Sequence, residues 1–348
     1  MDHDSIYTNY GLTVENETIA GSAKLFKSGA QSYLSYTATG DEREIDEQYY
    51  MALHLYEQGE PGVWLPIMNR EQSILTRVSE QSFIVCVQSS PLPAIYEPGK
   101  ALAIFHYRGR TIQTRMEHSS RMGKWKQMWE TRIDQLEKVW RDKLLSKPQN
   151  DFEKLFIDSY PYYAGLTENA IQYLVDTELD DDPELIDGGT VCHSRFTPHT
   201  WGQQTIGKVP KDWVFDHGAR DIAEYVRTHF LEQPNTYHQG VLTFLRQYQA
   251  VSPFSTFTAK MAYARLLLPI HFFETIETYY YIQSEGEKTM LEEKLGQYAK
   301  QSSLYERMLH DWYEMAGIPN GNSRLTVPEW IQTKRKNILI FEQIEIKR

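Results

Sequence analysis

The first 90 residues carry apolar positions at the short period of strands, interrupted by one helical pattern. The run Tyr33–Thr37 is aromatic and β-branched and follows a turn at Ser28-Gly29, which predicts a hairpin over Lys24–Thr39. Apolar residues near helical spacing, with acids concentrated at the start, predict a helix over Asp41–Gln58. Further short apolar runs predict strands at Val63–Met68, Ser73–Val78 and Phe83–Gln88.

The remaining residues are patterned mostly for helices. Met122–Leu145 is strongly amphipathic and includes three tryptophans, and a shorter helix is expected over Pro98–His106. Further helices are expected at about 150–159, 167–178, 221–232, 237–250, 256–282, 287–316 and 327–337, with a hairpin around 200–215. The predicted class is therefore α+β, with a small β-rich lobe over residues 1–95 and a large, mostly helical lobe over residues 96–348.

Length and composition narrow the class of protein. A chain of 348 residues with 41% hydrophobic content can bury a large core, and no stretch approaches the roughly 20 apolar residues of a membrane span. The net charge of -11 argues against general nucleic-acid binding, which relies on a basic surface. Met1–Ser5 shows no signal-peptide pattern, so synthesis and retention in the cytoplasm are expected. Cys86 and Cys192 predict no disulfide framework.

Tyrosine is unusually frequent, with 23 copies, several of them clustered as at Tyr160–Tyr163 and Tyr279–Tyr281. Because tyrosine can bury its ring while its hydroxyl stays hydrated, these clusters are expected mainly to pack between amphipathic elements. A role at an interface or in cross-linking is the alternative.

The segment from residue 190 to residue 221 carries the candidate chemistry. It contains Cys-His193-Ser-Arg195-Phe, then His199-Thr200-Trp201, then Asp212-Trp-Val-Phe-Asp216, and ends on Asp221-Ile-Ala. This order resembles the catalytic half of the aminoglycoside and choline kinase-like fold, whose pattern is His-Gly-Asp-x-x-x-x-Asn, a turn, Ile-Asp-Phe/Trp, and a downstream Asp-Leu-Ala. The resemblance implies a bilobal, protein kinase-like architecture.

The resemblance assigns a role to each matching position. His193 falls on the motif histidine and Asp221 on the helical aspartate, which in the family ties down the backbone of the catalytic loop. Arg195 falls on the aspartate that accepts the substrate proton, and Thr200 falls on the metal-binding asparagine. Phosphoryl transfer depends on a positioned carboxylate and metal, and an arginine can neither accept the proton nor bind Mg²⁺. The sequence thus predicts a degenerate catalytic segment.

The family's second metal-binding aspartate can be placed in two registers. Spacing from Arg195 puts Asp212 at this position and is preferred, whereas spacing back from Asp221 puts Val209 there. Asp212 and Asp216 are the candidate metal ligands, because with Asp221 they provide carboxylates near the expected cleft. No cofactor is expected, although ATP and magnesium binding stays open.

Two other interpretations compete for the same residues. Cys192, His193, His199 and His217 include the ligand types of zinc, but their spacing matches no familiar zinc motif. His193 and Asp221 could also act as an acid–base pair, yet the same contact is expected of an inert scaffold. We favour the structural interpretation of both sets.

The nucleotide-binding features of a kinase-like small lobe are weak. The resemblance calls for a strand lysine paired with a helix glutamate, but no lysine occurs between Ser28 and Thr39. Lys24 and Lys27 lie just upstream, and Glu44 and Glu47 are the candidate helix acids. Gly29 is better explained by an ordinary hairpin turn than by a phosphate-binding loop.

Three phrases make the resemblance more specific: Trp125-Lys-Gln-Met-Trp129, Cys-His-x-Arg-Phe-x-x-His-Thr-Trp, and Asp-Trp-Val-Phe-Asp-His-x-x-Arg-Asp-Ile-Ala-Glu. Together they resemble the YutH-type endospore coat-associated proteins, relatives of the CotS group of spore coat proteins. This resemblance implies synthesis in the mother cell cytoplasm, deposition in the spore coat, and other coat proteins as partners. The leading hypothesis is a pseudokinase of coat assembly or interaction. The alternative is an atypical ATP- and magnesium-dependent kinase, of small molecules or proteins, that uses Asp212 or Asp216.

Overall fold

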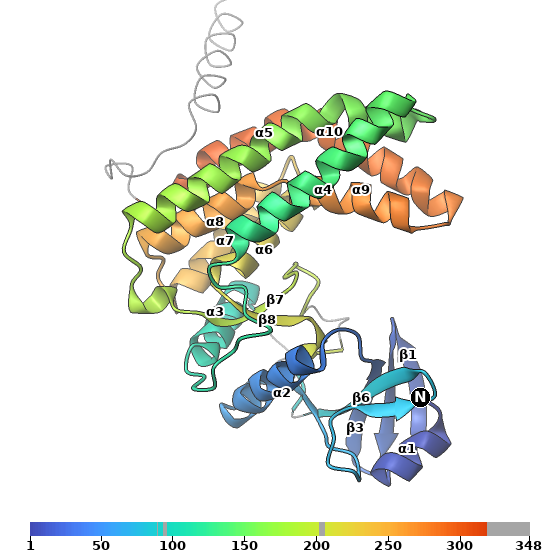
Figure 1. Cartoon of the computed structure of the whole chain (residues 1–348). Helices are drawn as coiled ribbons and strands as arrows, with labels where there is room; N and C mark the ends of the chain where they lie inside the picture. The colour runs from blue at the N-terminus through green and yellow to red at the C-terminus, as the bar shows by residue number, and fades with distance from the viewer. Residues whose placement is uncertain (89, 93–95, 202–205, 319–348) are drawn as a thin grey trace, which may run out of the picture. The chain divides into compact units, whose positions relative to one another are not determined.

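A computed structural model describes residues 1–88, 90–92, 96–201 and 206–318, and its elements are labelled in Figure 1. The chain divides into two compact units that interleave along the sequence. The first comprises Met1–Met122, Gly188–Asp221 and Arg246–Pro253, and the second comprises Gly123–Asp187, Ile222–Leu245 and Phe254–Arg348. The candidate segment from residue 190 to residue 221 therefore lies in the first unit.

The described strands of the small lobe form a six-stranded antiparallel sheet in the order β1-β2-β3-β6-β4, with β5 also paired to β6. The strands are β1 (Glu15–Ala20), β2 (Ala23–Ser28), β3 (Gln31–Thr37), β4 (Trp64–Pro66), β5 (Thr76–Val78) and β6 (Gln81–Gln88). The predicted β2–β3 hairpin is confirmed, and its Gly29 has a φ of 60°, which glycine adopts without strain. Strand β1 and the helix α1 (His3–Tyr10) were not predicted.

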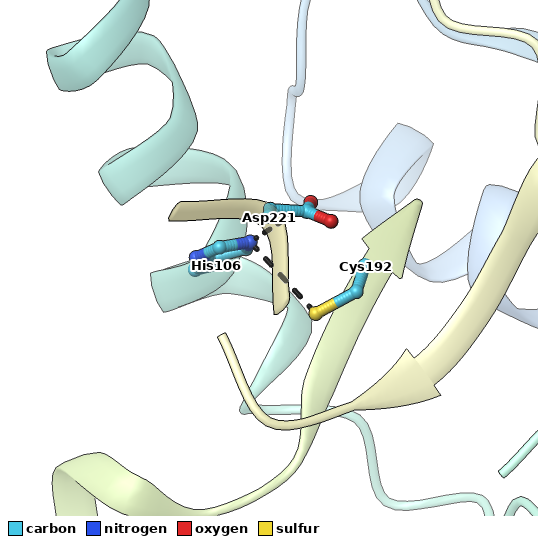
Figure 2. Close-up of side chains that lie close together, drawn as sticks. All are labelled: His106, Cys192 and Asp221. Atoms are coloured by element: carbon cyan, nitrogen blue, oxygen red, sulfur yellow. Dashed lines mark hydrogen bonds and ion pairs between the residues drawn. The ribbon is translucent and has the colours of Figure 1, made fainter. Parts of the chain in front are cut away.

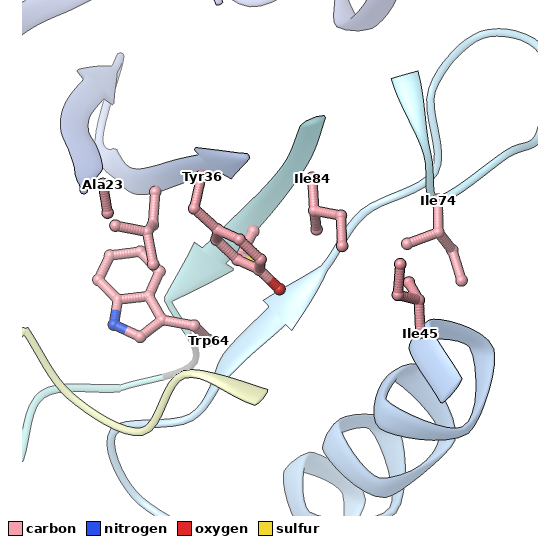
Figure 3. Packing of buried hydrophobic residues seen from close by; sticks show 8 residues of the cluster. Ala23, Tyr36, Ile45, Trp64, Ile74 and Ile84 are labelled. Atoms are coloured by element: carbon pink, nitrogen blue, oxygen red, sulfur yellow. The ribbon is translucent and has the colours of Figure 1, made fainter. Parts of the chain in front are cut away.

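Helix α2 (Glu42–Glu57) covers the sheet and confirms the prediction for this region. The Asp41 side chain begins the helix by accepting the N–H of Arg43 at 2.9 Å. Ile45 then joins a cluster of buried side chains, and Figure 3 shows it beside Ile74 and Ile84. The core under the sheet thus fixes the position of α2 and of the acids along it.

Helix α3 (Pro98–Gly109) and a two-stranded ladder complete the first unit around the candidate segment. Strand β7 (Thr190–His193) pairs antiparallel with β8 (Trp213–Asp216), and His193 lies opposite Trp213. The predicted hairpin around 200–215 is therefore wrong in its bounds. Its first strand ends at His193, and Thr200 instead closes a local turn by donating its N–H to the carbonyl of Thr197 at 3.0 Å.

The second unit consists largely of helices that pack side by side, as α4, α5 and α8 do in Figure 1. Its helices are α4 (Trp125–Ser146), α5 (Asp151–Asp180), α8 (Thr256–Leu267), α9 (Ile270–Tyr281) and α10 (Glu285–Met315). Helices α6 (Ala219–Glu232) and α7 (Tyr237–Gln249) contribute residues to both units. No helix within the described ranges is long and apolar enough to span a membrane.

Two helix predictions are corrected. The segments at 150–159 and 167–178 form one helix, α5, which continues through Pro161. Proline cannot donate the N–H that would bond the carbonyl of Ile157, and the indole of Trp140 donates to that carbonyl instead, at 3.2 Å. The predicted helix at 256–282 is two helices, because Leu268-Pro269 separates α8 from α9. The predicted helix at 327–337 lies outside the described residues.

Candidate functional site

Asp221 lies in the first turn of α6, fully buried, and bonds to the end of β7. Its carboxylate accepts the backbone N–H of His193 at 3.0 and 3.2 Å, and it lies 2.7 Å from Nδ1 of the same residue. Burial alone would raise the pKa of Asp221, but the facing imidazoles of His193 and His106 lower it below its usual value. Asp221 therefore stays ionised, and the ring nitrogens that face it carry protons.

His106 is the third member of this buried group, and it comes from α3. Its Nε2 lies 3.3 Å from Asp221 (Figure 2). Its Nδ1 lies 2.8 Å from the hydroxyl of Tyr248. Burial lowers the pKa of His106 to about 4, so its ring is neutral at neutral pH. It donates to Asp221 and accepts from Tyr248. Sequence reasoning missed His106, because only the fold brings α3 beside β7.

His106, Cys192 and Asp221 form the one group in the described part of the chain whose ligand atoms lie close enough for a metal ion (Figure 2). The Cys192 thiol lies 3.9 Å from Nε2 of His106 and 3.5 Å from the carbonyl of Asp216. Burial raises the pKa of this thiol well above its usual value, whereas zinc binds the thiolate. A hydrogen-bonded network accounts for the group without a metal.

The four residues of the alternative zinc set do not bring their ligand atoms together in the described structure. Nδ1 of His193 faces Asp221, and Nδ1 of His217 accepts the N–H of Ala219 at 3.0 Å. His199 is exposed. The side chains of the set are thus directed to separate local contacts.

The candidate segment also borders a cavity of about 450 Å³. Its lining residues are Ala20, Gly21, His193, Arg195, Thr200, Trp201, Ile206, Gly207, Val209, Lys211, Asp212 and Trp213. Both possible registers therefore lead to this cavity, since Val209 and Asp212 line it together. The carbonyl of Asp212 accepts the N–H of Ser194 at 2.7 Å, which holds Asp212 next to the end of β7.

The two candidate metal ligands differ in burial and in partners. Asp216 is buried at the end of β8, where its carboxylate accepts from Nε of Arg220 at 2.6 Å and from the N–H of His217 at 2.8 Å. The side chain of Asp212 is 64% exposed and lies 4.0 Å from the ammonium of Lys211. Asp216 is thus neutralised within the fold, whereas Asp212 faces the cavity.

The residues around this cavity do not fit the magnesium–nucleotide complex that the fold family implies. Mg²⁺ takes octahedral oxygen ligands and usually binds one or two carboxylates. Asp212 is the one carboxylate among the lining residues, and Arg195 and Lys211 bring positive charge beside it. The hydroxyl of Thr200 already accepts the N–H of Thr197 at 2.8 Å.

The candidate nucleotide-binding residues of the small lobe are engaged elsewhere. Lys24 pairs with Glu17 at 3.3 Å, and Glu44 pairs with Arg121 at 2.6 Å. Glu47 is buried and accepts backbone N–H groups of Glu117, His118 and Ser119 at 2.7–3.1 Å. Neither helix acid pairs with a lysine in the described structure.

Gly21, in the β1–β2 turn, lines the cavity and was missed by sequence reasoning. A single glycine between two short strands gave no recognisable phosphate-loop pattern. The turn could still have been identified from Gly21, because glycine favours tight turns between short strands. Its φ of 61° explains why glycine suits this position.

A buried ion cluster supports the wall of the cavity and was also missed. Lys208 and Arg108 both pair with Glu60, and the Lys208 ammonium lies 4.2 Å from the ring centroid of Trp201. The backbone of Lys208 pairs with the Gly62–Trp64 segment, through bonds of 2.7 and 3.0 Å. Glu60 and Lys208 are 148 residues apart in sequence, so no local pattern could reveal the pair.

Comparison with known proteins places this geometry in a family. Residues 3–312 match the family described as "Spore coat putative kinase YutH". The chain is 42% identical over 278 residues to the Endospore coat-associated protein YutH of Bacillus subtilis (strain 168), and this match covers 80% of the chain and 82% of the relative.

Solved structures of the kinase-like class show the same fold. An aminoglycoside phosphotransferase from Alicyclobacillus acidocaldarius matches with a TM-score of 0.65 at 14% identity, covering 91% of this chain and 97% of that one. The amicoumacin kinase hAmiN, solved with AMP-PNP, Ca²⁺ and Ami, matches with a TM-score of 0.54 at 11% identity, covering 87% and 92%. These likenesses confirm the predicted fold class. The chain belongs to the YutH family of spore coat proteins with an aminoglycoside phosphotransferase-like fold.

Proposed function

We propose that this protein is a spore coat-associated pseudokinase, which acts in coat assembly or interaction and does not transfer phosphoryl groups. The proposal is carried by Arg195 and Thr200, which the motif resemblance puts at the positions of the family's proton acceptor and metal-binding asparagine and which both line the cavity. Loss of a positioned general base alone costs about 10²–10⁴-fold in rate. The surroundings of both residues add to that loss.

The neighbouring acids do not replace the lost carboxylate. Asp216 is paired with Arg220 and buried, so it cannot reach a substrate in the cavity without breaking that pair. Asp212 remains accessible, but the cationic side chains of Lys211 and Arg195 share its cavity. This arrangement supports a site kept for shape and binding rather than for transfer.

The family supports the setting of the proposed function. The relative from Bacillus subtilis carries the name endospore coat-associated protein. We infer synthesis in the mother cell cytoplasm, followed by deposition in the coat, with other coat proteins as partners. ATP and magnesium have no required role in this proposal.

An atypical kinase is the second candidate, and one observation favours it. Asp212 lies with the Gly21 turn around a cavity of about 450 Å³, which falls within the size range of small-molecule sites. In this alternative Asp212 takes the place of the lost base or metal ligand. Metal-dependent phosphoryl transfer that requires Asp212 would establish it.

Replacement alleles in the spore-forming host test the proposed function. We expect an Asp212→Ala protein to be recovered from coat extracts at the wild-type level, with coat properties that match the wild type. Asp221→Ala is the companion variant, and we expect it to be lost from the coat because its fold is weakened. A coat defect in Asp212→Ala as severe as that of a deletion, with the protein folded and present, would contradict assembly without catalysis.

A further inference from the structure

Two residues that line the cavity each carry a buried polar atom with no hydrogen-bond partner among the described residues. The atoms are the indole N–H of Trp213 and Nε2 of His193, in side chains that are 0% and 4% exposed as residues. Buried polar atoms are nearly always bonded, so each such atom calls for an explanation, such as a water or a ligand. The indole nitrogen can only donate, which points to an acceptor on the missing partner.

The charges on the cavity wall also favour an acceptor with negative charge. Arg195 and Lys211 each contribute a cation, and Asp212 contributes the single opposing carboxylate. A guanidinium offers a planar set of donors that matches the oxygens of a phosphate. Arg195 falls on the position of the family's proton-accepting aspartate. A guanidinium there cannot accept a proton, but it can bind an oxyanion.

We propose that this cavity binds a phosphoryl group directly, through Arg195 and Lys211, without a divalent metal. The inference rests on the proposed absence of transfer and deepens it, because it gives the degenerate site a ligand class. Inorganic phosphate and the phosphates of a nucleotide share the required chemistry.

Titration of the full-length protein with inorganic phosphate and with ADP distinguishes the two sources. Each ligand is titrated by calorimetry in excess Mg²⁺ and, separately, in EDTA. We expect binding of at least one ligand in EDTA, with an affinity within about twofold of that in Mg²⁺. Binding that requires Mg²⁺, or no binding of either ligand at millimolar concentration, would overturn the proposal.

Substitution of the two cations distinguishes metal-free binding of a phosphoryl group from binding at a magnesium site. Arg195→Gln and Lys211→Gln should each weaken metal-free binding, the former by roughly tenfold or more, as expected for loss of a charged hydrogen bond. Arg115→Gln removes the same group from the surface of the first unit, where it pairs with Glu117, and should leave binding unchanged. If Arg195→Gln and Lys211→Gln both bind as the wild type does, the assignment is wrong.

Asp212→Asn provides the decisive contrast. Removing the opposing carboxylate should strengthen metal-free binding of phosphate by about threefold, since like charges in one site repel. At a magnesium site the same change would remove a ligand and weaken binding. Weaker binding by a folded Asp212→Asn protein overturns this inference, whereas the proposed function fails on a separate result, metal-dependent turnover of ATP.

Discussion

The two terminal residues of the segment from His193 to Asp221 differ in burial and in bonding from three residues between them. Asp221 is fully buried, and its carboxylate joins the backbone and ring of His193 to the ring of His106. Within the segment, Arg195, Thr200 and Asp212 border a cavity. The buried contacts that shape this segment are therefore separate from these three residues at the cavity, where we propose that transfer chemistry is absent.

This difference indicates that the buried contacts that stabilise the kinase-like fold involve other residues than those three residues at the cavity. The same division recurs on α2, where Glu47 is buried and anchors the backbone at residues 117–119 instead of pairing with a strand lysine. Glu44, on the same helix, makes a partly exposed pair with Arg121. Contacts that are buried and made to backbone should dominate stability, and exposed ones should matter little.

Asp221→Ala should have the largest effect on stability. It removes the acceptor of three donors and leaves buried imidazole and backbone N–H groups without partners, so we expect a loss of about 3–5 kcal/mol in the free energy of unfolding. Urea denaturation followed by tryptophan fluorescence measures this loss. Asp212→Ala is the matched control at a residue of the same segment that lines the cavity, and it should change stability by no more than about 0.5 kcal/mol. Equal losses in the two variants would remove the contrast between the buried contacts and the cavity residues.

The pH dependence of stability should reveal the buried ring of His106. Burial lowers its pKa from 6.5 to about 4, so between these values the unfolded chain binds a proton that the folded chain does not. Its contribution to stability is constant above pH 6.5 and falls as pH drops, by a total of about 3 kcal/mol near pH 4.

Comparing the free energy of unfolding at pH 7 and pH 4.5 in wild type and His106→Gln tests this prediction. The variant lacks the titrating ring and should lose less stability over the interval. His238→Gln, a change at an exposed position, should retain the wild-type dependence on pH. The assignment would be wrong if the wild type and His106→Gln lost stability equally.

Glu47→Gln compared with Glu44→Gln sharpens the same contrast within one helix. The Glu47 carboxylate accepts hydrogen bonds from backbone N–H groups and from the hydroxyl of Ser119. Removing its charge should cost about 2 kcal/mol, as for buried hydrogen bonds to a charged group. The partly exposed pair of Glu44 should contribute less than about 1 kcal/mol. Thermal unfolding of both variants checks the order, and a larger loss in Glu44→Gln would reverse it.

Thr200→Val tests the role of the residue that, by the resemblance, falls on the family's metal-binding asparagine. Its hydroxyl accepts the N–H of Thr197, so the substitution should cost about 1 kcal/mol of stability. We also expect Thr200→Val to leave the affinity for nucleotide in the presence of magnesium unchanged. A selective loss of magnesium-dependent binding would instead make Thr200 a ligand.

Local signals explain which parts of the fold could be predicted. The turn at Ser28-Gly29, the acid-rich start of α2 and the apolar spacing of α6 each lie within a few residues, and all three elements are present. The continuation of α5 through Pro161 could not be predicted, because the indole that satisfies the freed carbonyl comes from α4. The boundary between lobes at residue 95 stays a prediction.

The candidate site divides in the same way. The spacing of the motif identified His193 and Asp221, and the structure brings these two residues together. His106 and the Glu60–Lys208 pair depend on contacts across more than 100 residues, which no local pattern encodes. The roles of Arg195, Thr200 and Asp212 in binding or metal chemistry stay predictions, and their positions around one cavity make them testable together.

Turnover of ATP by the purified full-length protein tests the central claim most directly. Phosphate release is followed in Mg²⁺ and in EDTA, for wild type and for Asp212→Ala. We predict that the rate in Mg²⁺ matches the rate in EDTA and does not change on substitution, because in the proposed function Arg195 and Thr200 stand at the positions of the proton acceptor and of a metal ligand. Turnover that requires Mg²⁺ and disappears in a folded Asp212→Ala protein would contradict the account.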